Sequence, residues 1–360
     1  MTPMKDQFVG CLIGGAVGDA LGGSVEFMSR SAIVDRFGPA GITSYAPAYG
    51  GIGTITDDTQ MTLFTAEGLL RAWVRDCDGG ISCFAATTAL AYLRWFITQG
   101  EHPRHGVLPM TERATWLMSH RELHDQRAPG TTCLSALRAT TRPGAPASNN
   151  SKGCGGVMRV APVGLFASRA EWSAVGTFDL ATSLAALTHG HPSGSLSGGV
   201  LAVMIRDLVE GATLDESLAG AKDILRTKPE HDETLAAVEL AEQVAAENVA
   251  PEEAIARLGE GWVAEEALAI SIYCALVARD FEHGVMIAVN HDGDSDSTGA
   301  ITGNLLGARD GIGVIGEQWL EPLELRDVIT EMATDLYEFT DWELDAPGVA
   351  EKYVGLQPTG

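Results

Sequence analysis

The stretch NHDGDSDSTG, residues 290–299, places three carboxylates at alternate positions directly before an apolar run. The three carboxylates are those of Asp292, Asp294 and Asp296. Oxygen ligands at this density are what Mg²⁺, Mn²⁺ or Ca²⁺ requires. An EF-hand loop starting at Asp292 would need Gly sixth and Glu twelfth, where the chain has Ser297 and Gly303. A helix N-cap explains one or two acids, but not three followed by two hydroxyls. We therefore interpret the stretch as a metal site at the start of a helix.

A second acidic cluster, TDDT at residues 56–59, also opens an apolar run. A single Asp-x-Asp run does not complete the coordination shell of a divalent cation, so a second group of ligands is needed. We expect the fold to bring the two clusters together around two ions. Coordination positions would then remain for water and for substrate oxygens.

The composition excludes several classes of protein. The chain has 48 Asp and Glu against 24 Lys and Arg, a formal charge of −24, and no basic patch, so we expect no nucleic-acid partner. Its six cysteines show no C-x-x-C spacing, which argues against zinc and disulfides and favours a reducing cytoplasm. Asp19 interrupts the apolar segment 8–17 too early for a membrane span, and no clear cleavage site follows. We expect a buried helix there.

Helical patterns dominate the chain, and convincing alternation of Val and Ile is scarce. The sequence TLDE at residues 213–216 is a capping box that starts a helix. Further expected helices span residues 58–75, 84–98, 232–247 and 251–259. We therefore predict an all-α fold. Because the two acidic clusters must converge, we expect a single domain over residues 1–360 rather than the two that this length would suggest.

Glycines crowd the first helix. They are Gly10, Gly14, Gly15, Gly18, Gly22 and Gly23. Glycine destabilises a helix, so this density predicts close approach of another backbone. Two nearby acids, Asp19 and Glu26, lie among small and apolar residues, and if buried they must be paired, protonated or associated with metal. The segment 30–55, rich in Gly, Pro and Ser, is expected to be a loop.

Two further stretches carry potential chemistry. The Gly-rich sequence SNNSKGCGGVMR, residues 148–159, can present backbone amides to an anion, although it lacks the ending of a Walker A loop and a plain turn is the alternative. In LTHGHP, residues 187–192, we expect at least one histidine to be a hydrogen-bonded core residue, because a carboxylate-rich site prefers oxygen ligands. We interpret RAPGTT, residues 127–132, as a structural turn entering a helix.

Five separated motifs together resemble the ADP-ribosylglycohydrolase family, which includes bacterial dinitrogenase reductase-activating enzymes and mammalian ADP-ribosylhydrolases. They are GDALG at 18–22 with Glu26, TDDT at 56–59, SKGCGGVMR at 151–159, Thr188-His189, and GDSDS at 293–297. The resemblance runs from about residue 7 to 309. It implies an orthogonal helical bundle with two Mg²⁺ or Mn²⁺ ions at the bottom of a cleft, and we expect the C-terminal part to pack onto this domain.

The resemblance also implies a role for individual residues. The implied metal ligands are Thr56, Asp57, Asp58, Asp294, Asp296 and Ser297, with Asp296 between the two ions. Glu26 matches a position beside the metals that gates the site or acts as a base, with Asp57, Asp58 and Asp296 as its catalytic neighbours. The implied diphosphate contacts are Ser151, Gly153, Cys154, Gly155 and His189.

Three positions depart from the family pattern. Lys152 and Cys154 stand where some members have an aromatic residue and an amide, so their ligand contacts are open. Asp292 stands where many members have a small residue, and we expect it to lie behind the metal ligands.

The expected function is hydrolysis of an N-glycosidic bond that joins ADP-ribose to arginine in a modified protein. Vicinal ribose hydroxyls can ligate two metal ions, and a nearby carboxylate can take a proton from water. The alternatives are release from O-linked serine or another ADP-ribosyl conjugate, and an immunity-type protein that also blocks a partner ADP-ribosyltransferase. A two-metal phosphohydrolase of the HD type would need more histidine ligands. A non-catalytic member of the family is disfavoured by the intact carboxylates.

Overall fold

The computed structural model describes residues 2–79 and 82–354, and this part of the chain contains no β-strand. Two isolated bridges are its only extended pairings. The all-α prediction is therefore confirmed. The α-helices are α1 (Met4–Gly22), α2 (Arg30–Phe37), α3 (Asp57–Cys77), α4 (Phe84–Thr98), α5 (Thr131–Ala139), α6 (Ala161–Arg169), α7 (Ala174–Ala185), α8 (Pro192–Val209), α9 (Leu214–Leu225), α10 (Asp232–Glu247), α11 (Pro251–Leu258), α12 (Ala264–Val277), α13 (Phe281–Val289), α14 (Ser295–Asp310), α15 (Glu317–Leu320), α16 (Arg326–Glu338) and α17 (Pro347–Val349).

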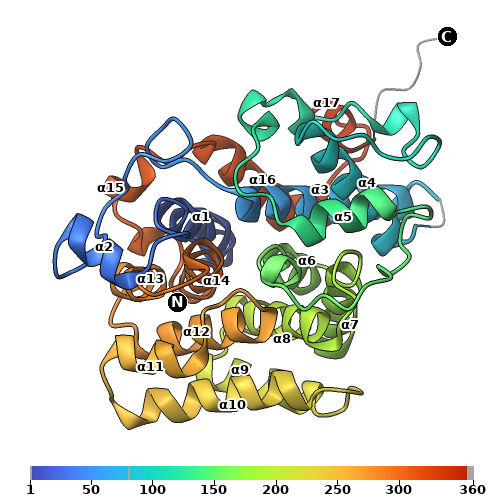
Figure 1. Cartoon of the computed structure of the whole chain (residues 1–360). Helices are drawn as coiled ribbons and strands as arrows, with labels where there is room; N and C mark the ends of the chain where they lie inside the picture. Colours follow the sequence, from blue (N-terminus) through green and yellow to red (C-terminus); the bar gives the residue numbers. More distant parts are fainter. Residues whose placement is uncertain (1, 80–81, 355–360) are drawn as a thin grey trace.

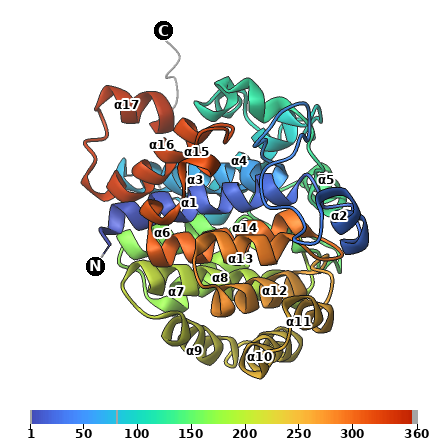
Figure 2. The ribbon, with the colours of Figure 1, turned by 90° about the vertical axis from the view of Figure 1, so that its left-hand side faces the viewer.

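Helices α1 and α14 lie side by side and antiparallel at the centre of the molecule (Figure 1, Figure 2). Every fourth residue of α1 is a glycine that faces the backbone of α14. The pairs that form this glycine seam are Gly10 with Gly307, Gly14 with Gly303, Gly18 with Gly299, and Gly22 with Ser295. A methyl group on any of these α1 glycines would overlap the backbone of α14, so the helices approach more closely than side chains permit. The predicted backbone contact is confirmed.

The remaining helices form layers around this pair (Figure 2). Helices α8 and α12 pack against α14, and α9 and α10 cover them from outside. Helices α3 and α4 pack together on the other side, and α16 contacts α1, α3 and α6. None of the helices in the described part of the chain has both the length and the apolar character to cross a membrane.

One expected loop is partly helical. The first eight residues of segment 30–55 form α2, which corrects the sequence prediction. The side chain of Ser29 caps the helix by accepting from the backbone N–H of Ala32 at 3.2 Å. The backbone N–H of Arg30 donates to the carboxylate of Asp292 at 2.9 Å. The helix therefore depends on a cap and a distant carboxylate rather than on periodic apolar residues, of which only Ile33 is buried.

Candidate functional site

Five carboxylates from three segments meet at one cavity of about 470 Å³. Asp57 and Asp58 begin α3, while Asp294 is the N-cap of α14 and Asp296 lies in its first turn. Glu26 lies in the turn that follows α1. All five line the cavity and all are buried, with exposed fractions between 2 and 7%. The two acidic clusters therefore converge, and the seam between α1 and α14 explains why Glu26 joins them.

The carboxylates of the cavity lack cationic partners among the described lining residues. Oxygen atoms of Glu26, Asp294 and Asp296 lie within 4.8 Å of one another. One buried oxygen in each of Glu26, Asp58 and Asp294 has no hydrogen-bond partner among the described residues. No Lys or Arg belongs to the described residues that line the cavity. Unpaired buried carboxylate oxygens at this spacing fit divalent cations, which take oxygen ligands from several carboxylates.

Burial and, second to it, like charges at close range raise the pKa values of Glu26, Asp57, Asp58 and Asp294. Burial raises the pKa of Glu26 to about 11, with the charge of Asp296 as the next cause. Burial also raises the pKa values of Asp57, Asp58 and Asp294 well above the usual range, and in each the charge of Asp296 is again second. The charge of Asp296 thus acts on all four of these neighbours, and bound cations would favour their ionised forms.

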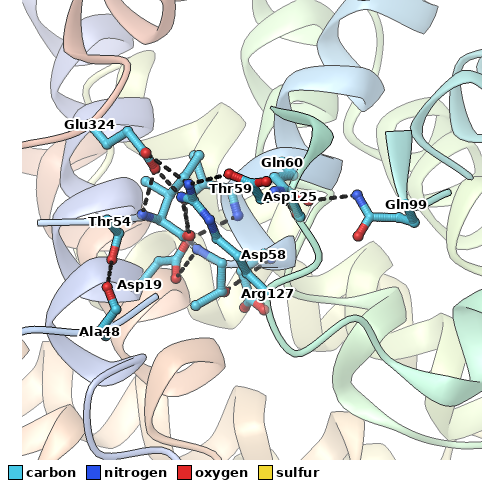
Figure 3. Close-up of polar contacts among 12 residues, drawn as sticks. Asp19, Ala48, Thr54, Asp58, Thr59, Gln60, Gln99, Asp125, Arg127 and Glu324 are labelled. Atoms are coloured by element: carbon cyan, nitrogen blue, oxygen red, sulfur yellow. Dashed lines mark hydrogen bonds and ion pairs between the residues drawn. The ribbon is translucent and has the colours of Figure 1, made fainter. Parts of the chain in front are cut away.

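A polar network behind the cluster holds the start of α3 (Figure 3). Asp19, buried in α1, accepts from two backbone N–H groups at the start of α3 and from the hydroxyl of Thr59. Arg127 forms an ion pair with Glu324, and its carbonyl accepts from the backbone N–H of Asp57 at 3.2 Å. Asp19 is therefore paired through hydrogen bonds, and α1 fixes the orientation of the Asp57-Asp58 pair.

Part of the Gly-rich stretch and His189 form another part of the cavity wall. Gly153, Cys154 and Gly155 line the cavity together with His189. The backbone N–H of Cys154 donates to the carbonyl of Trp262 at 3.2 Å, which ties the stretch to the segment before α12. A methyl group added to Gly155 would lie 3.0 Å from the His189 ring, so glycine allows the close approach.

Two expected site residues, Thr56 and Ser151, lie outside the cavity lining, and so does Asp292, which was expected behind the metal ligands. The hydroxyl of Thr56 caps α3 by accepting from the backbone N–H of Asp58 at 3.3 Å. The hydroxyl of Ser151 forms a hydrogen bond of 3.0 Å with the hydroxyl of Thr132, which lines the cavity. Asp292 is exposed and holds α2, as described above. Ser297, by contrast, lines the cavity beside Asp296.

Sequence reasoning missed part of the lining. Residues 128–132, interpreted as a structural turn, line the cavity, and the N–H of Gly130 donates to Asp57 at 3.1 Å. Phe27 and Trp262 stack at 6.2 Å between ring centroids and also line it, with 74% and 40% of their surfaces exposed. The position of Phe27 next to Glu26 was the one available signal. Nothing in the local sequence around Trp262 indicates a site.

The histidines of residues 187–192 have different surroundings. His189 lines the cavity, whereas His191 accepts from the backbone N–H of Ser193 at 3.2 Å and caps α8. Lys152, next to the Gly-rich wall, forms ion pairs with Glu233 and Glu265. The side chains of His191 and Lys152 thus both have their partners outside the cavity lining.

The fold is shared with a solved structure of an ADP-ribosylglycohydrolase-related protein complex. The two chains are 28% identical with a TM-score of 0.68, and the match covers 94% of this chain and all of the other. The family model for ADP-ribosylglycohydrolase matches residues 1–344. The chain therefore belongs to the ADP-ribosylglycohydrolase family, and it is an enzyme of a family that hydrolyses ADP-ribosyl conjugates.

Two bacterial relatives match over most of the chain. The ADP-ribosylarginine hydrolase Tri1 of Pseudomonas putida is 25% identical over 94% of this chain and 80% of its own length. The ADP-ribosyl-[dinitrogen reductase] glycohydrolase of Rhodospirillum rubrum is 25% identical over 90% of this chain and 92% of its own. The expectation of a partner ADP-ribosyltransferase gains no support from these relatives.

Proposed function

We propose that the protein removes ADP-ribose from arginine side chains of modified proteins and that it uses two Mg²⁺ or Mn²⁺ ions. The observation that carries the proposal is the convergence of five buried carboxylates on a cavity whose described lining offers them no cationic side chain. The Gly-rich part of the wall, with glycine backbone and a histidine, suits the diphosphate of the same ligand.

The two acidic clusters are the proposed metal ligands. The residues that would hold the ions are Asp57, Asp58, Asp294, Asp296 and Ser297, with Thr56 assigned by family resemblance alone. Bound divalent cations would offset the carboxylate charge and hold the vicinal hydroxyls of the ribose. Asp296, whose charge acts on every neighbouring carboxylate, is the proposed residue between the ions.

The proposed reaction requires the protein to transfer one proton. Water attacks the anomeric carbon as the bond to the guanidinium nitrogen breaks, and the electron pair of that bond stays on the nitrogen. Glu26 is the proposed group that accepts the proton from this water and returns it to the departing guanidine. Its position in a turn, with one oxygen buried and unpartnered, leaves it free of the backbone contacts that hold Asp57.

Three observations favour arginine as the linkage. The relative from Pseudomonas putida is named for this specificity, although at 25% identity. The stacked pair Phe27 and Trp262 offers exposed aromatic faces beside the carboxylates, and a guanidinium binds to such faces more favourably than a serine side chain does. The negative charge of the chain acts in the same direction, although salt screens it.

Matched peptides that carry ADP-ribose on either arginine or serine test the proposal. We expect release of ADP-ribose from the arginine peptide, detected by mass spectrometry, to stop in EDTA and to return with Mg²⁺ or Mn²⁺. Faster release from the serine peptide would replace arginine by serine while keeping the family reaction. Full activity after confirmed removal of metal would contradict the metal centre itself.

A further inference from the structure

Arg159 is a buried cation behind the Gly-rich wall. It is not exposed at all, and it takes part in no ion pair among the described residues. Its Nε donates to the hydroxyl of Tyr92 at 3.0 Å, and the guanidinium lies over the Tyr92 ring at 4.3 Å. Its Nη2 donates to the hydroxyl of Thr188 at 2.6 Å. A buried charge held only by neutral partners is costly.

The hydroxyl of Thr188 joins Arg159 to His189. Its oxygen lies 2.8 Å from Nδ1 of His189 and 3.5 Å from the carbonyl of Ala185. A guanidinium can only donate, so the Thr188 oxygen is the acceptor toward Arg159. The single hydroxyl proton remains for one of the other two contacts, and the shorter one is to Nδ1 of His189.

A histidine that accepts at Nδ1 carries its proton on Nε2 when the ring is neutral. Nε2 of His189 has no hydrogen bond among the described residues and lies on the side of the Gly-rich wall. A methyl group added to Gly153 would lie 3.3 Å from this atom. The free N–H is therefore directed at the wall that also presents the amides of the Gly-rich stretch.

We propose that Arg159 and Thr188 are positioning residues that fix His189 as a neutral ring with its proton on Nε2, which donates to the anionic diphosphate of the substrate. The identity of that ligand rests on the proposed function. The assignment of the proton to Nε2 is independent of it. With the proton on Nδ1 instead, Nε2 would present a lone pair to the phosphate oxygens and weaken binding.

The electrostatic surroundings support a neutral ring. Burial lowers the pKa of His189 to about 3, and the nearby charge of Arg159 is the second cause. A neutral imidazole is the form for which the position of the proton matters, since both nitrogens donate in the charged form.

Imidazole nitrogen NMR on ¹⁵N-histidine-labelled protein tests the relay. We expect the signals of wild-type His189, assigned by their loss in His189→Gln, to show a protonated Nε2. Thr188→Val keeps the shape of the side chain and removes the hydroxyl, so we expect mixed tautomers. Thr188→Ser restores the hydroxyl and should restore the wild-type signals. The matched control is Thr177→Val, a buried threonine that loses a 3.0 Å hydrogen bond to the carbonyl of Ser173 in α7.

Ligand binding supplies the second measurement. In buffer with Mg²⁺, we expect ADP-ribose to bind about tenfold more weakly to Thr188→Val, the loss of roughly one hydrogen bond, and normally to Thr188→Ser and Thr177→Val. A protonated Nδ1 in the wild-type protein, or unchanged binding and tautomer in Thr188→Val, would overturn the relay. Failure of the protein to release ADP-ribose from any peptide would overturn the proposed function and leave the tautomer result standing.

Discussion

Asp296 is the charge that acts most on each of the other four carboxylates of the cavity. Its charge contributes to the raised pKa of Glu26 and of Asp57, Asp58 and Asp294. Groups that repel one another in the protein alone become ligands once cations are present. The same residues should therefore oppose folding without metal and be needed for function with it.

Single asparagine substitutions separate these two effects. We expect Asp57→Asn, Asp58→Asn, Asp294→Asn and Asp296→Asn each to lower kcat by at least a hundredfold, because an amide replaces a proposed ligand. The metal-free variants should be at least as stable as the wild-type protein, since one buried charge is gone. Turnover assays and thermal unfolding in EDTA measure the two effects.

Asp292→Asn is the matched control on the same stretch. This residue is exposed and accepts from the backbone of Arg30, so its substitution should leave kcat within a few-fold of wild type. Loss of activity equal to that of Asp294→Asn would place Asp292 among the ligands.

The pKa of His189 predicts a pH effect on stability. The folded-state pKa is about 3, below the ordinary value of 6.5. Below about pH 6.5 the unfolded chain binds a proton at this site that the native protein does not bind, so this site lowers the free energy of unfolding as the pH falls toward 3. We expect His189→Gln to gain stability relative to wild type between pH 7 and pH 4 in denaturant titrations. A constant difference over this range would show that the native ring also takes up the proton.

At the scale of elements, the glycine seam determines how the site is assembled. It places the start of α14 next to the end of α1, and the turn after α1 then brings Glu26 to Asp294 and Asp296. A shift of one helix along the other would separate these carboxylates without breaking either helix.

A methyl group in the seam tests this dependence. Gly18→Ala would place its Cβ against the backbone carbonyl of Gly299, which cannot move without displacing α14. We expect a loss of about 1–3 kcal/mol of stability and reduced affinity for Mg²⁺, measured by denaturant unfolding and calorimetry. Gly220→Ala in α9 is the control, because its Cβ would meet only the Asp207 side chain at 3.5 Å. That variant should be neutral or slightly more stable.

Helices that are marked by nearby residues, such as a cap or an apolar period, can be predicted from the sequence. The capping box at Thr213 is present with both of its hydrogen bonds, and α4, α10 and α11 begin and end within a residue or so of the expected positions. Helix α2 was not predicted, because its first backbone N–H donates to Asp292, a residue far away in the sequence. Long-range partners of this kind leave no periodic pattern.

The site residues also divide into those with a local signal in the sequence and those without one. Carboxylates of the two acidic clusters could be found because metal chemistry concentrates acids in short runs. Trp262 could not be found in this way, because it comes from a remote segment of the chain. Its backbone carbonyl accepts a hydrogen bond from the backbone N–H of Cys154. The metal-ligand roles of Ser297 and Thr56 stay predictions. The Thr56 hydroxyl caps α3, and the Ser297 hydroxyl contacts the sulfur of Met158.

For the whole molecule, metal binding should add to stability. Ions that bind only the assembled clusters stabilise the native state in proportion to the logarithm of their concentration over Kd, or about 2.7 kcal/mol at a hundredfold excess. We expect the Tm to rise by several degrees when Mg²⁺ or Mn²⁺ is added to the metal-free protein, as followed by scanning calorimetry. The Asp296→Asn variant should show a much smaller rise.

We also propose that the chain folds as one unit over residues 1–360. Helix α16 packs against α1, α3 and α6, which ties the C-terminal part to α3, the helix that begins with Asp57 and Asp58. Circular dichroism and tryptophan fluorescence should then report one coincident unfolding transition. Two separated transitions would indicate independent domains.

The central helix pair has a consequence for synthesis on the ribosome. The backbone carbonyl of Cys11 accepts a hydrogen bond from Asn304, 293 residues later in the chain. At rates of elongation of about 5–20 residues per second the first helix would wait roughly 15–60 s for its partner to be made. During that time a glycine-rich, apolar segment has no native surface to cover it. We therefore expect α1 to be a binding site for chaperones on the nascent chain, and the metal centre to form only when translation is nearly complete.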